Sequence, residues 1–176
     1  MEPVVSDHMQ ACDGFAHVVS TVKSEAWSSP SPCTDWDARG VLEHVIGFHD
    51  VLLLRPLEAK PSRPKDDPVA RWQVTLDALS AVLSRPDVLT TERAGLLAYL
   101  TTEVLVHTWD LAKATGVAVT LDSHLCQIGV DRATASPQSM SRDMFDAPFP
   151  VPEDADVQDR LVGLFGRDPD WRPPPH

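Results

Sequence analysis

Apolar residues recur at helical spacing in four stretches of the chain, and the last of these is the most regular. In residues 96–114, at 100° per residue, one stripe is apolar and is formed by Leu96, Leu100, Val104, Leu111 and Ala114. Glu103 and His107 lie inside this stripe. A buried carboxylate needs a cation, a hydrogen-bonding network or a metal ion, because an unpaired buried charge costs several kcal/mol or takes up a proton. The pattern therefore predicts a polar site in the core.

The remaining apolar patterns predict three earlier helices. The first runs from about residue 6 to 27, the second follows a cap at residues 34–37, and the third carries apolar residues at helical spacing up to Leu83. The fourth ends at Gly116. These helices predict an all-α protein, an antiparallel four-helix bundle over about residues 6–116, with a short C-terminal helical extension over about 117–176, all in a single domain of residues 1–176.

The extension is predicted from capping residues and prolines. Asp122 begins a helix that reaches about Ala135, and a last short helix covers about Asp154 to Phe165. Between them, residues 147–152 must be extended, because three prolines alternate there with other residues.

Spacing alone favours a simple interpretation of Glu103 and His107, a hydrogen bond across one helical turn. A metal ion needs a third ligand from elsewhere. Both His44 and His49 on the second helix are candidates, and periodicity does not choose between them. His8 carries little weight, because a histidine near a helix end is more often half-buried.

Composition excludes several classes of protein. The net charge is −11 and no Lys/Arg cluster is present, which argues against a nucleic-acid partner. The three cysteines contain no CxxC pair, so neither a disulfide framework nor a cysteine zinc site is indicated. Without a leader or a long apolar run, we expect a soluble cytoplasmic protein with no membrane partner.

Two stretches together resemble a known family. Residues 32–45 read Pro-Cys-Thr-Asp-Trp-Asp-Ala-Arg-Gly-Val-Leu-Glu-His-Val, and residues 103–112 read Glu-Val-Leu-Val-His-Thr-Trp-Asp-Leu-Ala. They resemble the DinB/YfiT-like superfamily, in particular its actinobacterial branch related to the metal-binding N-terminal domain of mycothiol-dependent maleylpyruvate isomerase. Residues 161–171 resemble a recurring ending of that branch.

The resemblance implies a divalent metal ion held by His44, Glu103 and His107, in preference to His49. Two imidazoles and one carboxylate suit zinc, with nickel or another divalent ion as alternatives, and leave a fourth position for water or substrate. Asp110, one turn after His107, is a candidate to accept the other ring N–H of that ligand, although an exposed capping or salt-bridging role is an equal alternative.

The resemblance also implies a function. A thiol cofactor such as mycothiol, bound to the metal, would lose its proton and attack an electrophile, as in thiol-dependent transferases and isomerases. The expected partners are therefore a small-molecule thiol and an electrophile, with a homodimer as a further expectation. The isomerase itself has a second C-terminal domain, which argues against maleylpyruvate as substrate. The alternative is a non-catalytic metal-binding or ligand-binding accessory protein in stress response or detoxification.

Overall fold

The computed structural model describes residues 2–135 and 147–174, and within these the chain forms helices and no strand. This confirms the predicted all-α class. The four long helices are α1 (Pro3–Thr21), α2 (Ala38–His49), α3 (Pro68–Leu83) and α4 (Thr91–Thr115). Two short C-terminal helices follow, α5 (Ser123–Ala135) and α6 (Val157–Leu164), and two single turns complete the set, the 3₁₀ helix η1 (Ser24–Ser28) and the π-helical turn η2 (Asp50–Leu54).

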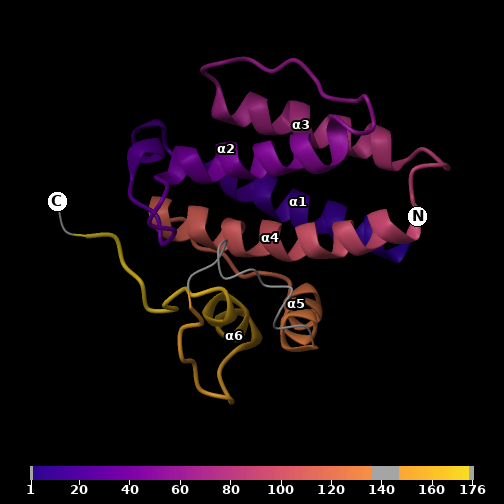
Figure 1. Cartoon of the computed structure of the whole chain (residues 1–176). Coiled ribbons are helices and arrows are strands. Elements are labelled where there is room, and N and C mark those ends of the chain that lie inside the picture. Colours follow the sequence, from indigo (N-terminus) through magenta and orange to yellow (C-terminus); the bar gives the residue numbers. More distant parts are fainter. Residues whose placement is uncertain (1, 136–146, 175–176) are drawn as a thin grey trace.

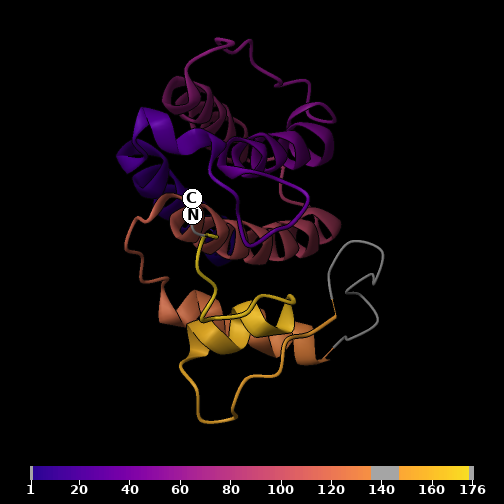
Figure 2. The ribbon, with the colours of Figure 1, turned by 90° about the vertical axis from the view of Figure 1, so that its left-hand side faces the viewer.

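The four long helices lie side by side as a bundle (Figures 1 and 2). α1 packs against α3 and α4, and α2 packs against the same two helices, so α1 and α2 face each other across the bundle. α2 runs antiparallel to α4, whereas α2 and α3 run in the same direction (Figure 1). Residues 55–67 therefore return along the outside of the bundle instead of turning at its end.

α4 is the central helix of the molecule. On one side it contacts α1 and α2, and on the other it contacts α5 and α6. From Leu100 to Ala112 every residue of α4 is buried. The apolar stripe predicted burial of one face, which holds Glu103 and His107. The C-terminal region covers another face, so Asp110 is buried as well.

The helix ends follow local capping. The Asp37 carboxylate accepts a hydrogen bond from the Gly40 backbone N–H at 2.7 Å and begins α2, three residues later than Thr34 would have done. α1 ends at Thr21, so the predicted continuation to Trp27 is wrong, and a separate 3₁₀ turn takes its place. Gly116 ends α4 as predicted, with a φ of 70° that favours glycine.

The C-terminal extension packs on α4 through α5 and α6. Residues 147–152 are not helical, as their prolines predicted, and the Phe149 N–H donates to the Gly163 carbonyl at 2.8 Å. Gly166, with a φ of 81°, ends the region and turns the chain so that Arg167 is buried beside α4. Among the described residues, no helix combines the length and the apolar character needed to cross a membrane.

Candidate metal centre

His44 from α2 and Glu103 and His107 from α4 meet where these two helices pack together. Each offers one ligand atom, and the three atoms all lie within 4.8 Å of one another. Nε2 of His107 is 3.8 Å from Oε2 of Glu103, and the rings of His44 and His107 are 4.8 Å apart between centroids. The 3.8 Å gap is too long for a hydrogen bond, so Glu103 and His107 do not form the simple pair that spacing alone favoured.

Glu103 is the unsatisfied member of this cluster. Its side chain is buried, and among the described residues its Oε1 atom has no hydrogen-bond partner. Burial raises the pKa of the carboxyl to about 7, against the opposing effects of nearby His107 and Arg167 and of a hydrogen bond with the Tyr99 side chain. A buried carboxylate oxygen without a partner costs free energy that a positive ion at this point would remove.

His44 is a half-buried neutral imidazole. Burial, together with the neighbouring His107 and Arg167, lowers its pKa to about 4. Its ring stacks on Trp36, with centroids 4.1 Å apart and an angle of 23° between the planes. Trp36 directly precedes Asp37, the cap of α2, and packs against the His44 ring near the middle of the helix. A neutral ring keeps a nitrogen lone pair available for a metal ion.

Asp110 contacts the Nδ1 atom of His107 and is itself paired with Arg167. Nδ1 of His107 is 3.0 Å from Oδ2 of Asp110, and Arg167 donates to both carboxylate oxygens, at 3.1 Å and 2.8 Å. Burial opposes ionisation of Asp110, but the hydrogen bond from His107 and the Arg167 charge outweigh it and hold its pKa below the usual value. The Nδ1–H of His107 is thus directed at Asp110, which leaves Nε2 free for a ligand.

Sequence reasoning missed Arg167. The residue lies 57 positions after Asp110, and the only local signal was its place directly after Gly166 in the recurring ending. Its guanidinium and the Asp110 carboxylate are both buried, which gives a bidentate pair with good geometry. Asp110 is therefore not exposed, but it forms a salt bridge with Arg167 in addition to its hydrogen bond with His107.

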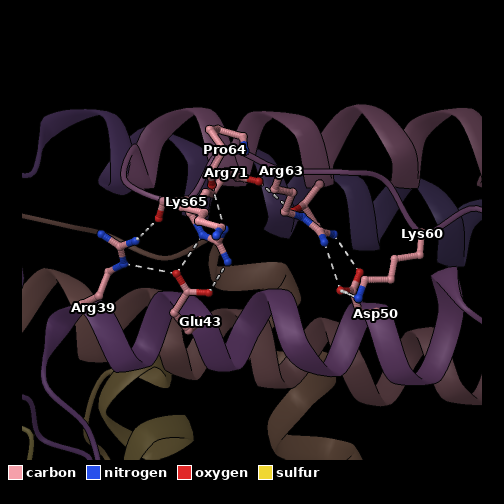
Figure 3. Close-up of polar contacts among 9 residues, drawn as sticks. Arg39, Glu43, Asp50, Lys60, Arg63, Pro64, Lys65 and Arg71 are labelled. Carbon is pink, nitrogen blue, oxygen red and sulfur yellow. Dashed lines mark hydrogen bonds and ion pairs between the residues drawn. The ribbon is translucent and has the colours of Figure 1, made fainter.

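Glu43 of α2 and Asp50, the first residue of η2, serve the structure. Glu43 accepts one hydrogen bond from Arg39 and two from Arg71, and Asp50 accepts two from Arg63 (Figure 3). Arg71 also donates to the Pro64 carbonyl. These pairs tie the returning segment 55–67 to α2, so neither carboxylate faces the metal cluster.

His49, the alternative third ligand, lies outside the cluster of His44, Glu103 and His107. Its Nδ1 donates to the Val45 carbonyl at 2.7 Å, and its Nε2 faces His8 at 3.2 Å. His8 is fully buried, contrary to the half-buried position expected of a helix-end histidine. The exposed His124 contacts neither cluster.

Comparison with known proteins relates the chain to one family. The model of the mycothiol maleylpyruvate isomerase N-terminal domain matches residues 8–75, which include His44 but end before α4. Two proteins of Mycobacterium tuberculosis, from strains CDC 1551/Oshkosh and H37Rv and both described as uncharacterized, are 30% identical over 95% of this chain and 98% of their own length. No solved structure matches the chain. By these matches the chain belongs to the family of the mycothiol maleylpyruvate isomerase N-terminal domain.

Proposed function

We propose that this protein binds one divalent metal ion through His44, Glu103 and His107 and uses it in a reaction that depends on a small thiol. The partnerless Oε1 atom of Glu103 is the observation that carries the proposal, because a buried carboxylate beside two imidazoles fits a cation better than it fits protein alone. Two nitrogen ligands and one oxygen ligand suit zinc, and nickel is the nearest alternative.

Three protein ligands would leave one coordination position of the metal ion open for water or substrate. Three protein ligands are typical of catalytic zinc sites, in which water or substrate takes the fourth position. His44 is half-buried whereas Glu103 and His107 are buried, so His44 marks the side from which a small molecule would approach. Asp110 and Arg167 would hold His107 in one tautomer and orientation, and Trp36 would hold His44.

The family name supports a thiol such as mycothiol as the co-reactant. A bound divalent ion acts as a Lewis acid and lowers the pKa of a coordinated thiol. In a transfer reaction the thiol proton goes to solvent, a C–S bond forms and the leaving group departs from the electrophile. In an isomerisation the thiolate adds to a conjugated double bond and is expelled after rotation, with no net change in atoms. The electrophile is small in either case.

The test measures metal content and thiol-dependent turnover together. Wild type, His44→Ala and Glu103→Ala are purified, and bound metal is measured by elemental mass spectrometry. His17→Ala is the matched control, since His17 is exposed on α1. We expect stoichiometric metal in wild type and the control, and loss in the two ligand variants while circular dichroism stays helical.

Turnover then separates the two functions. Mycothiol with a panel of electrophiles, including a cis-configured conjugated acid, should be consumed by wild type and not by the ligand variants. Metal retention without any thiol-dependent turnover would instead identify a non-catalytic metal-binding protein. Absence of metal in wild type, before and after zinc addition, would overturn the proposal altogether.

A further inference from the structure

A second cluster of metal-ligating side chains lies at the centre of the bundle, away from the one described above. His8 and Cys12 come from α1 and His49 from α2, and all three are completely inaccessible to solvent. Nε2 of His8 is 3.2 Å from Nε2 of His49. Sγ of Cys12 is 3.6 Å from the first nitrogen and 4.0 Å from the second. Three potential donor atoms therefore converge on one point.

Hydrogen bonds on the outer side of each ring determine which nitrogen carries the proton. The Thr101 hydroxyl donates to the Leu97 carbonyl at 2.8 Å, so its oxygen accepts from His8 Nδ1–H at 3.2 Å. His49 Nδ1–H donates to the Val45 carbonyl at 2.7 Å. In neutral rings, with the Thr101 hydrogen on the Leu97 carbonyl, both Nε2 atoms are bare lone pairs that face each other, whereas a Thr101 O–H turned to His8 Nδ1 would leave His8 Nε2–H to donate to His49 Nε2.

Without a metal ion, protons in the neutral rings resolve this conflict only if the Thr101 hydroxyl gives up its bond to the Leu97 carbonyl. The Cys12 thiol has a single S–H and can satisfy one of the two nitrogens, which leaves the other facing a lone pair. Protonating a ring is unfavourable, because burial lowers the pKa of His8 to about 4 and that of His49 well below its usual value. Burial also raises the pKa of Cys12, so the thiol does not give up its proton without a cation.

The triangle of donor atoms has the size of a metal coordination shell. Bonds of about 2.0 Å to nitrogen and 2.3 Å to sulfur, opened to about 109° to 120°, give N···N separations of about 3.3 to 3.5 Å and N···S separations of about 3.5 to 3.7 Å. The measured edges are 3.2, 3.6 and 4.0 Å. Both rings also have the outer hydrogen bond that metal-bound histidines almost always make.

We propose that His8, Cys12 and His49 form a second cation site, closed to solvent and suited to monovalent copper. Thiolate ligands favour soft ions such as Cu(I). One thiolate and one Cu(I) sum to zero charge, whereas a divalent ion would leave a net positive charge in the core, where burial of charge is costly. On binding, the Cys12 S–H breaks, the proton leaves to solvent and a Cu–S bond forms, with no change of oxidation state.

The test asks whether Cu(I) binding depends on Cys12. Because the cluster is closed to solvent, Cu(I) is added in two ways under anaerobic conditions, during refolding and to the folded protein. The copper that the protein retains is then measured against a competing Cu(I) chelator. Cys12→Ser is compared with Cys126→Ser and Cys33→Ser, which make the same change at a buried and a half-buried cysteine outside the cluster. Glu103→Gln tests independence from the site of the proposed function.

We expect stoichiometric copper in wild type, Cys126→Ser, Cys33→Ser and Glu103→Gln, and at least a tenfold loss of affinity in Cys12→Ser. X-ray absorption on loaded wild type should show two nitrogen neighbours and one sulfur neighbour, a readout that does not require the variant to fold. Equal retention in wild type and Cys12→Ser, an all-sulfur shell, or preferential binding of zinc at this cluster would each overturn the proposal.

Discussion

The bundle contains two clusters of similar composition and opposite access. Each combines two histidines with one acidic or thiol group, with candidate ligand atoms within 4.8 Å. His44 in the first is half-buried, whereas every member of the second is fully buried. Catalytic metal sites keep an open position and structural sites are closed. The partly exposed cluster between α2 and α4 therefore fits our proposal of a reactive site, and the buried cluster between α1 and α2 fits our proposal of a closed one.

The groups that accept hydrogen bonds from the Nδ1 atoms of the histidines also differ between the two clusters. His107 donates to Asp110, an ionised carboxylate held by Arg167, while His8 and His49 donate to a neutral hydroxyl and a neutral carbonyl. The first cluster thus carries the negative charge of Glu103 and Asp110 against Arg167, and the second has none until Cys12 is deprotonated. This difference favours a divalent ion at the first and a monovalent ion at the second.

The largest expected effect comes from breaking the buried pair behind the first cluster. Arg167→Gln leaves the Asp110 carboxylate buried without its arginine, and we expect a loss of about 3–5 kcal/mol in the free energy of unfolding of the metal-free protein. The matched control is Arg71→Gln, which breaks a part-exposed pair with Glu43 (Figure 3) and should lose about 1 kcal/mol or less. Urea denaturation measures both; similar losses would show that Asp110 does not depend on Arg167.

Glu103 of the first cluster and His8 of the second should respond to pH with opposite signs in the metal-free protein, whereas His44, with a pKa of about 4, has the same sign as His8. Glu103 has a pKa of about 7 when folded and 4.5 as its usual value, so the folded state holds the extra proton between these pH values and stability falls as pH rises through them. His8 has a pKa of about 4 when folded and 6.5 as its usual value, so the unfolded state holds the extra proton and stability falls as pH drops from 6.5 to 4.

Each effect amounts to about 3 kcal/mol, at 1.36 kcal/mol for each unit of pKa. Stability is measured by chelator-treated denaturation curves from pH 4 to 8. Glu103→Gln should gain stability relative to wild type as pH rises through 4.5–7, and His8→Asn should show a smaller decline than wild type below pH 6.5, because His44 and His49 keep their own contributions. A variant whose profile runs parallel to that of wild type would contradict the assignment for that residue.

An effect of intermediate size is expected from changing Asp110, the carboxylate that accepts a hydrogen bond from His107 in the first cluster. Asp110→Asn keeps an oxygen acceptor for His107 but removes its charge, and we expect zinc affinity to fall roughly 10- to 100-fold. Cu(I) affinity should stay the same, because Asp110 contacts no member of the second cluster. Competition titrations with chelators for each ion measure the two affinities, and parallel losses of both would mean that the clusters are not independent.

The smallest expected effect concerns the outer hydrogen bond of the second cluster. Thr101→Val leaves the His8 Nδ1–H buried without an acceptor, so we expect a loss of about 1 kcal/mol in stability, within the range for an unsatisfied buried donor, and weaker Cu(I) binding. Thr102→Val is the control, since the Thr102 hydroxyl only donates to its own helix, at 3.4 Å. Unchanged stability in Thr101→Val would argue against the assigned His8 tautomer.

Local sequence determined much of the fold and two of the three residues of the first cluster. The apolar spacing predicted the four long helices, and a residue at i and another at i+4 share a helix face, which placed Glu103 beside His107 on α4. Gly116 ended that helix because glycine adopts a positive φ at little cost. The family resemblance added His44, which periodicity alone left level with His49.

Tertiary structure decided which side chains meet. His44 and His49 are five residues apart, which is about 140° around a helix, so they face different neighbours once α2 has packed. One faces α4 and the other faces α1, where His8 and Cys12 lie. Arg167 reaches Asp110 only because α6 and the Gly166 turn fold back on α4. Contacts between residues 37 to 57 positions apart depend on the path of the whole chain, which no local pattern encodes.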